Sequence, residues 1–249
     1  MSNKHNIKLC ANTQIGRGHI KNSIVCQDKV YILSKKSQKG QFHGLALCDG
    51  AGSKAFSHDG AEVISRYILQ YILANFNRIY QKNDTNDITK AIEKRLTKYA
   101  TKNSIEYNEL ASTLEFVAIL DDRFISGHIG DGVIGYIKND VLKVLSHPDN
   151  GEFANSTFFT TSNNIKKRLR IYKGYIKDIS GFILMSDGTS DSFYDMRKKE
   201  LISQCKDIIY WLKSDSIDEV NRAIKHNLEK YISQRTQDDC SLGLIYISK

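Results

Sequence analysis

Strand-like and helix-like segments occur in blocks along this chain of 249 residues, and the order of the blocks limits the folds open to it. Short apolar runs predict strands at 31–34, 43–48, 113–120, 123–129, 133–138, 141–145, 181–186 and 241–247. Several of these runs are separated by only a few residues, as in antiparallel hairpins. Because a doubly wound parallel sheet alternates strands and helices one by one, the blocks favour an α+β fold with antiparallel sheets and helices layered on their faces.

Apolar residues at helical spacing predict two helices after the second strand and two more before the last one. The first helix is expected from 58 to 80, with Ile64, Ile68 and Phe76 on its apolar face. The other three are marked by Ile88, Ala91, Ile92, Leu96 and Tyr99, by Leu201, Cys205, Ile208 and Leu212, and by Val220, Ile224, Leu228 and Tyr231. With one proline and no low-complexity linker, residues 1–249 are expected to form a single domain. The weakly patterned segment at about 148–179 is interpreted as a flap beside the functional cleft.

The composition excludes several classes of protein and partner. The net charge is +8, but acidic residues are interleaved with the lysines, and the basic cluster at 166–173 is better explained as a solvated face than as a nucleic-acid site. No apolar stretch approaches the ~18 residues of a membrane span, and the N-terminal residues are too polar for a secretion signal. The five cysteines are scattered without a C-x-x-C motif, which argues against a zinc site and fits a reducing compartment. We therefore expect a cytoplasmic protein without a nucleic-acid or membrane partner.

The segment 45–63, LALCDGAGSKAFSHDGAEV, allows two interpretations. Residues 50–55 match the G-x-G-x-x-A form of the dinucleotide-binding fingerprint, but that fingerprint works within a βαβ unit, and here the first helix leads into a second one. Cysteine-based dephosphorylation is excluded as well, because no cysteine is followed by an arginine six positions later. The favoured interpretation is a carboxylate, Asp49, placed at the end of a strand to bind a metal ion.

Acidic residues recur where apolar strands meet solvent. Asp49, Asp131 and Asp187 each follow such a strand and precede a glycine; Asp191 lies four residues after Asp187, and the pair at 238–239 stands immediately before the last strand. Paired strands are about 5 Å apart, so these carboxylates could converge, and their repulsion would then require cations. Oxygen ligands without His or Cys suit Mg²⁺ or Mn²⁺ rather than Zn²⁺. The competing explanation is a tight turn, because Asp-Gly is a frequent turn pair.

Six motifs, in this order, resemble the metal-dependent protein phosphatases of the protein phosphatase 2C (PPM) type. The motifs are GRGHIKNSIVCQDKV, LALCDGAGS, ASTLEFVAI, SGHIGDGVIGYI, FILMSDGTSD and DDCSLGLIYI, and they span nearly the whole chain. GEFANSTFFTTS is similar to a segment of a bacterial branch of that family. The resemblance implies a four-layer α-β-β-α sandwich, in which two antiparallel sheets pack face to face with helix pairs on the outside.

The resemblance also implies a centre with two Mn²⁺ or Mg²⁺ ions. Asp49 would bridge the ions, the carbonyl of Gly50 would bind one of them, and Asp187 and Asp238 would complete the ligands of the second. A hydroxide bridging the two ions would hydrolyse phosphoserine or phosphothreonine directly, without a covalent phosphoenzyme. The expected partner is therefore a phosphorylated protein, namely a serine/threonine kinase or its target.

Two further features follow from the same resemblance. Asp131, with Asp187 and Asp191, matches a looser third metal site. Asp28 matches the acidic residue that orients metal-bound water.

Three positions depart from the family's pattern. Gln27 stands where many relatives have a glutamate, which removes a charge near the metals, and Ala51 stands where some eukaryotic members have a histidine proposed as general acid. Ser23 stands where the phosphate-binding arginine is usual, so His19 or Lys21 would contact the phosphate, with His19 favoured. These departures favour the alternative function: a catalytically weak relative that binds a kinase or a phosphoprotein without turning it over.

Overall fold

The computed structural model describes residues 5–82, 85–150 and 157–248. Its strands are β1 (Asn6–Gln14), β2 (Lys29–Ser37), β3 (Gly40–Cys48), β4 (Leu114–Leu120), β5 (Arg123–Ile129), β6 (Val133–Lys138), β7 (Val141–Ser146), β8 (Arg170–Tyr175), β9 (Ile179–Met185), β10 (Tyr194–Asp195), β11 (Glu200–Leu201) and β12 (Cys240–Ser248). Its helices are α1 (Arg17–Lys21), α2 (Ser57–Gln81), α3 (Asn86–Asn103), α4 (Ile165–Arg168), α5 (Asp187–Ser190), α6 (Gln204–Ser214) and α7 (Ile217–Asn227). A 3₁₀ turn, η1 (Tyr107–Leu110), and a π-helical turn, η2 (Leu228–Ile232), complete the elements.

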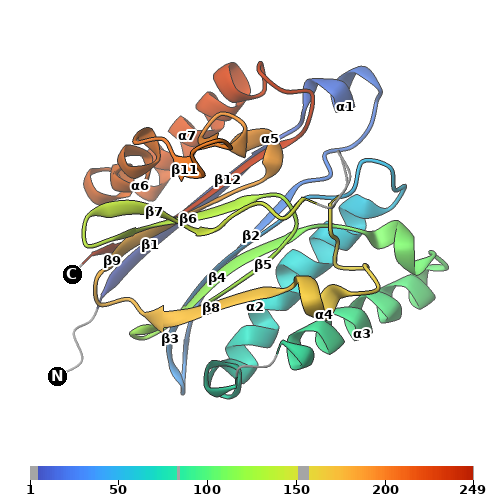
Figure 1. The fold of residues 1–249 in the computed structure, drawn as a ribbon, viewed down its shortest axis with the longest axis horizontal. Coiled ribbons are helices and arrows are strands. Elements are labelled where there is room, and N and C mark those ends of the chain that lie inside the picture. The colour runs from blue at the N-terminus through green and yellow to red at the C-terminus, as the bar shows by residue number, and fades with distance from the viewer. Residues whose placement is uncertain (1–4, 83–84, 151–156, 249) are drawn as a thin grey trace.

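Ten of the strands form two antiparallel sheets of five strands each. The β1 sheet has the order β1-β12-β9-β6-β7, and the β2 sheet has the order β2-β3-β4-β5-β8. The sheets lie face to face, with α2 and α3 outside the β2 sheet and α6 and α7 outside the β1 sheet (Figure 1). The expected α+β fold, a four-layer α-β-β-α sandwich, is confirmed.

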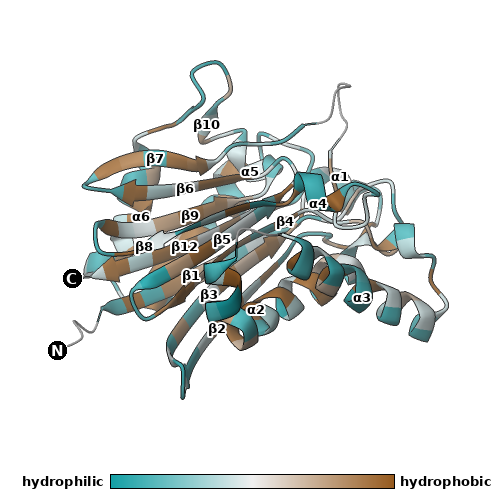
Figure 2. Ribbon diagram, turned by 60° about the horizontal axis from the view of Figure 1, so that its bottom comes forward, coloured by the Kyte–Doolittle hydropathy of each residue, from teal (hydrophilic) through white to brown (hydrophobic). Residues whose placement is uncertain are grey.

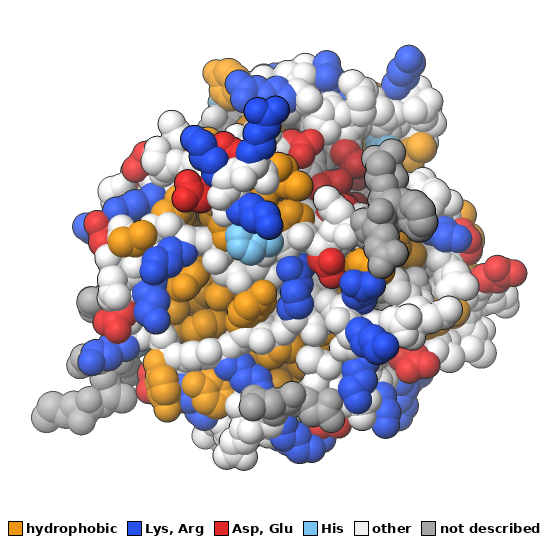
Figure 3. Space-filling view, viewed as in Figure 1, with side chains coloured by type: hydrophobic (Ala, Val, Ile, Leu, Met, Phe, Trp, Pro, Cys, Tyr) orange, Lys and Arg blue, Asp and Glu red, His pale blue; other side chains and the backbone are white. Residues whose placement is uncertain are grey.

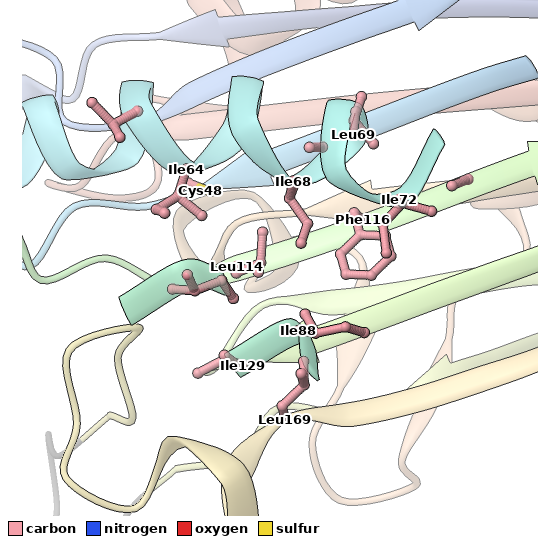
Figure 4. Close-up of a cluster of buried hydrophobic side chains, with 14 of the residues drawn as sticks. Cys48, Ile64, Ile68, Leu69, Ile72, Ile88, Leu114, Phe116, Ile129 and Leu169 are labelled. Atoms are coloured by element: carbon pink, nitrogen blue, oxygen red, sulfur yellow. The ribbon is translucent and has the colours of Figure 1, made fainter. Parts of the chain in front are cut away.

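Buried apolar side chains fill each of the three spaces between neighbouring layers. Ile64 and Ile68 of α2 pack against Phe116 of β4 in the space between helix and sheet (Figure 4). The next residue of β4, Val117, lies in the cluster between the two sheets with Phe182, because successive side chains of a strand point to opposite faces. A third cluster joins the β1 sheet to α6 and α7. Burial of each large apolar side chain stabilises the fold by roughly 1.5–3 kcal/mol, and hydrophobic colour is accordingly concentrated on the strands in Figure 2.

Two strands of the five-stranded sheets, β1 and β8, are missing from the sequence prediction, as is the short pair β10 and β11. Both β1 and β8 are edge strands, and most of their residues are only partly buried, so neither carries a continuous apolar run. Because β8 pairs with β5 over residues 170–175, that part of the segment expected as a flap at 148–179 belongs to the sheet. Residues 151–156 of the segment lie outside the described residues.

The late helices also differ from the prediction at their ends. Leu201 belongs to the short strand β11 rather than to a helix, and α6 begins at Gln204. Tyr231 lies in the π-helical turn with 58% of its surface exposed, so it is not part of the buried helix face. Asn139 and Asp140 both have positive φ (50° and 64°) and form the tight turn of the β6–β7 hairpin. Among the described helices, none is long and apolar enough to cross a membrane.

Candidate metal centre

The strand ends next to Asp49, Asp131, Asp187 and Asp238 lie at one end of the sandwich, which carries α1 and α5 and is remote from the chain termini (Figure 1). In the β1 sheet, Met185 of β9 pairs with both Leu242 of β12 and Val133 of β6. In the β2 sheet, the ends of β3 and β5 flank the start of β4 in the same way. In an antiparallel pair, one strand ends where its neighbour begins. These pairings therefore place the aspartates at the same end of each sheet. In the space-filling view, acidic side chains gather toward the α5 end of the visible face (Figure 3).

Asp49 is held in place by the start of β4. Its backbone N–H donates to the hydroxyl of Thr113 (2.9 Å), and its carbonyl accepts from the N–H of the same residue (2.7 Å). Gly50 forms an isolated bridge with Ser112. These contacts give the Ser-Thr pair before β4 a defined role, which is to fix the loop that follows β3. Since β4 is also the antiparallel neighbour of β3, this loop lacks the βαβ unit within which the dinucleotide-binding fingerprint works.

Asp49 and Asp187 come from different sheets and act on each other directly. Burial raises the pKa of Asp49 well above its ordinary value, and the charges of Asp28, Asp187 and Asp238 raise it further. Burial also raises the pKa of Asp187 to about 7, with the charges of Asp131 and Asp238 adding to the effect and a hydrogen bond from Asp49 opposing it. The two carboxyl groups therefore hold a proton between them or require a cation in its place.

Asp28 and Gln27 lie just before β2, with exposed fractions of 1% and 4%. The hydroxyl of Ser186 donates to Oδ2 of Asp28 (2.8 Å). Burial raises the pKa of Asp28 to about 8, and the charges of Asp239 and Asp187 contribute. The other oxygen of Asp28, Oδ1, and the side-chain oxygen of Gln27 are buried and have no hydrogen-bond partner among the described residues. Buried oxygens without a partner are rare in folded proteins, and here two occur side by side in the sequence.

Asp239 is a central residue of the site to which the sequence prediction gave no role. Its side chain is 1% exposed and accepts hydrogen bonds from the backbone N–H groups of Gly16 (2.7 Å) and Gln27 (2.6 Å) and from Nδ1 of His19 (2.9 Å). Because a carboxylate oxygen accepts the hydrogen bond, Nδ1 of His19 carries the hydrogen in this contact. Nε2, the other ring nitrogen, is not engaged by Asp239. Asp239 thus ties the segment between β1 and β2 to the start of β12, at the candidate metal centre. The sequence pattern could not separate buried Asp239 from exposed Asp238.

The residues weighed for phosphate binding occupy different surroundings. The side chain of His19 is 13% exposed and is held against Asp239, whereas Lys21 is exposed at the end of α1. Ser23 is exposed in the turn after α1, with a φ of 55°. Ala51 is 7% exposed and presents only a methyl group. Of these four side chains, only His19 is held beside a carboxylate of the site, through its contact with Asp239.

Asp131, Asp191 and Asp238 form the outer part of the site. Burial raises the pKa of Asp131, and the charges of Asp238 and Asp191 add to the rise, while a hydrogen bond from the hydroxyl of Thr157 opposes it. Partial burial raises the pKa of Asp191, and the charge of Asp238 raises it further. Both residues are nevertheless exposed to solvent. The sequence prediction missed Thr157, which lies 26 residues from its partner.

The donor set suits a hard divalent cation. All the expected side-chain ligands supply oxygen, two buried oxygens lack a partner, and several carboxyl groups raise one another's pKa. None of the expected aspartates forms an ion pair with a lysine or arginine in the described part of the chain. As the side chains stand, no three His, Cys, Asp or Glu residues in the described ranges form a closed cage for an ion. The structure therefore brings the expected residues into electrostatic contact without closing a ligand cage.

Several solved bacterial phosphatases share this fold. The serine/threonine phosphatase Stp1 from Staphylococcus aureus is 16% identical, with a TM-score of 0.65 over 98% of this chain and 96% of Stp1. The catalytic domain of the serine threonine protein phosphatase PstP, in complex with two manganese ions, is 17% identical, with a TM-score of 0.61 over 99% and 100%. RsbX in complex with magnesium is 14% identical, with a TM-score of 0.59 over 100% and 98%. No curated protein sequence matches the chain.

A family model provides the stronger evidence. The model described as Protein phosphatase 2C matches residues 15–231, which include every expected site residue except Asp238. This match covers most of the chain, and it confirms the resemblance carried by the six motifs and the enzyme class that the motifs imply. The chain belongs to the protein phosphatase 2C family.

Proposed function

We propose that this protein is an active serine/threonine phosphatase that hydrolyses phosphoserine and phosphothreonine with two Mn²⁺ or Mg²⁺ ions and a looser third. One observation carries the proposal: the strand-end carboxyl groups raise one another's pKa, while no lysine or arginine of the described chain pairs with them. Such repulsion is relieved when cations bind. The manganese and magnesium in the structures of PstP and RsbX support the choice of cation.

The proposed ligands are Asp49, Gly50 through its carbonyl, Asp187, Asp238, Asp131 and Asp191. Asp49 would bridge the first two ions, and Asp131 and Asp191 would belong to the third site together with Asp187. When bound, the ions lower the pKa of water toward neutrality and neutralise charge on the phosphate.

The chain itself supplies orientation and further charge. Ser186 fixes one oxygen of Asp28 and leaves the other free to accept a hydrogen bond from the attacking water. Asp239 holds the His19 ring through Nδ1, so Nε2 is the atom that contacts a phosphate oxygen. The five cysteines are unpaired, which fits a reducing cytoplasm. None of them is followed by an arginine six positions later, which fits direct hydrolysis without a thiol nucleophile. The proposed substrate is a phosphorylated protein, either a serine/threonine kinase or the target of one.

A second candidate function is that of a catalytically weak relative that binds a kinase or phosphoprotein. It is favoured by the methyl group of Ala51, which offers no proton to the leaving oxygen, and by the uncharged amide of Gln27. Calorimetric titration with Mn²⁺ separates the two candidates in part, because a collapsed site should bind no ion tightly.

The decisive experiment measures turnover of p-nitrophenyl phosphate and of a phosphothreonine peptide. Turnover should require added Mn²⁺ or Mg²⁺ and should disappear with EDTA. Asp49→Asn and Asp187→Asn should abolish it, whereas Asp122→Asn, at an exposed strand end far from the site, should leave it unchanged. Metal-dependent turnover that survives Asp49→Asn would show that the site assignment is wrong. Tight Mn²⁺ binding without turnover would favour the second candidate.

A further inference from the structure

Three polar side chains on neighbouring strands form a ladder between the two sheets, and we call them the Glu115–His128–Arg170 ladder. Glu115 of β4 pairs with His128 of β5, and His128 pairs with Arg170 of β8. The three strands lie side by side in Figure 1. The side chain of Glu115 is on the same strand face as Val117, which lies in the cluster between the sheets. Glu115 and His128 have no exposed surface.

The chemistry of the ladder fixes its protonation state. Nη2 of Arg170 donates to Nδ1 of His128 (3.0 Å), and since a guanidinium has no acceptor, Nδ1 must carry a lone pair. Burial, and then the charge of Arg170, lower the pKa of His128 well below its ordinary value, so the ring is neutral with its hydrogen on Nε2. Nε2 lies 3.9 Å from Oε1 of Glu115. Burial raises the pKa of Glu115 well above its ordinary value, and the charge of Asp131 contributes to the rise.

The ladder contains several polar atoms whose hydrogen bonds are missing. Both carboxyl oxygens of Glu115, Nε2 of His128 and Nε of Arg170 are buried without a partner among the described residues. A buried polar atom without a hydrogen bond destabilises the folded state. Apolar side chains at these positions would extend the cluster between the sheets, so stability alone does not explain the ladder, and conflicts of this kind concentrate at functional sites.

The ladder contacts the backbone on both sides of Asp131. Arg170 donates through Nη2 to the carbonyl of Gly130 (3.5 Å) and through Nη1 to the carbonyl of His147 (2.5 Å). On the other side, the carboxyl of Glu115 lies against Gly132, where an added Cβ would stand 1.5 Å from Oε1. Gly130 has a φ of 113°, which a residue with a side chain rarely adopts, so this bend needs support from its neighbours.

We propose that Glu115, His128 and Arg170 are positioning residues that set the place of the Asp131 carboxylate by holding the backbone before and after it. His128 links the two ends of the ladder and keeps the Arg170 fork turned toward Gly130. This inference rests on the proposed function, because it takes Asp131 to be a ligand of the looser cation. The ladder itself contacts neither substrate nor ion and acts through Asp131.

The test compares Arg170→Met with Arg170→Lys in the full-length protein. Mn²⁺ binding is followed by calorimetry, and turnover of a phosphothreonine peptide is measured against Mn²⁺ concentration. In Arg170→Met the weakest Mn²⁺ binding event should weaken by roughly ten- to hundred-fold, the usual effect of losing support behind a metal ligand. The Mn²⁺ concentration for half-maximal turnover should rise by a similar factor, while the KM for the peptide and the tighter binding events stay unchanged. Arg170→Lys, which keeps the charge but not the fork, should show a smaller change in the same event.

Arg123→Met provides the matched control. Arg123 faces Tyr175 at the opposite end of the β5–β8 pairing and should affect thermal stability without changing any Mn²⁺ event. If all Mn²⁺ events in the Arg170 variants weaken equally as the thermal midpoint falls, the ladder is merely structural and the inference is overturned. Unchanged Mn²⁺ binding in both Arg170 variants overturns it as well. If the wild-type protein neither binds Mn²⁺ nor turns over, the proposed function fails and the inference fails with it. Should Arg170→Met not fold, the conservative Arg170→Lys decides.

Discussion

Replacing Asp28 by asparagine should make the metal-free protein more stable at neutral pH while it lowers turnover. Asp28 is 1% exposed, and its charge is opposed by burial and by the charges of Asp239 and Asp187. An asparagine has nearly the same shape and carries no charge. The substitution therefore removes the destabilisation and also the acceptor proposed to orient water.

The magnitude follows from the pKa of Asp28. An unfolded aspartate has a pKa of about 3.9, whereas burial raises that of Asp28 to about 8 in the folded protein. The folded protein thus binds the Asp28 proton more tightly than the unfolded chain does. The protonated side chain contributes its full stability to the fold below about pH 4, and this contribution is lost as the pH rises from there through 8. At pH 7, about 3 pH units above the unfolded value, the loss is roughly 4 kcal/mol. Even if asparagine lost the hydrogen bond from Ser186, worth about 1 kcal/mol, a net gain of about 3 kcal/mol would remain.

Urea unfolding in EDTA at about pH 5, 7 and 8.5 measures the effect. The wild type should lose stability as the pH rises, and Asp28→Asn should lose less, with the largest difference above pH 7. Asp122→Asn, whose side chain is 63% exposed in the wild type, should follow the wild type and serves as the control. Wild-type stability in EDTA that is constant or rises from pH 5 to 8.5, or an Asp28→Asn protein no more stable than wild type at pH 7, would refute the reasoning.

Three further variants test other parts of the structure. Gly188→Ala would place a methyl group 2.2 Å from the carbonyl oxygen of Asp239, so we expect a loss of about 1–3 kcal/mol in thermal unfolding and weaker Mn²⁺ binding; normal values for both would contradict the packing described. His19→Gln and Asp239→Asn should each slow turnover of a phosphothreonine peptide by roughly ten- to hundred-fold, and the double variant should be no worse than either, whereas additive losses in steady-state kinetics would show that the two residues act independently. Phe116→Ala should lower the free energy of unfolding in urea by about 3–5 kcal/mol and leave Mn²⁺ affinity unchanged, because Phe116 lies in the helix-facing core; a changed affinity would contradict that separation.

Strands could be predicted where burial on both faces leaves a nearly continuous apolar run. All seven residues of β4 are buried, and the sequence marks it clearly even though Glu115 interrupts the run. The edge strand β8 is different, because its residues are partly exposed and include Arg170 and Lys173, so a surface loop and an edge strand have the same composition. The order of the blocks nevertheless predicted antiparallel sheets with helices on their faces, and the resemblance to the family predicted the four layers.

The site could be predicted only where a local pattern carries it. Asp49, Asp131 and Asp187 each follow an apolar strand, and antiparallel pairing is enough to place them at one edge. Asp239 and His19 could not be linked in this way, because they are 220 residues apart and no local rule says which member of an acidic pair is buried. Contacts of this kind depend on the register between distant segments and on side-chain burial, which become visible only in the folded chain.

Gln27 shows how a departure from the family's pattern fits this particular site. Its backbone N–H donates to Oδ2 of Asp239 (2.6 Å), and its side-chain oxygen is buried without a partner in the part of the chain described. A glutamate here would add a charge next to Asp28, whose pKa burial already raises to about 8. The amide instead offers an oxygen lone pair without further repulsion. A neutral residue at this position is therefore compatible with the proposed metal centre. The strand-end aspartates would supply the charge that attracts cations, and Gln27 keeps a buried oxygen acceptor beside Asp28 without adding a charge that destabilises the metal-free fold.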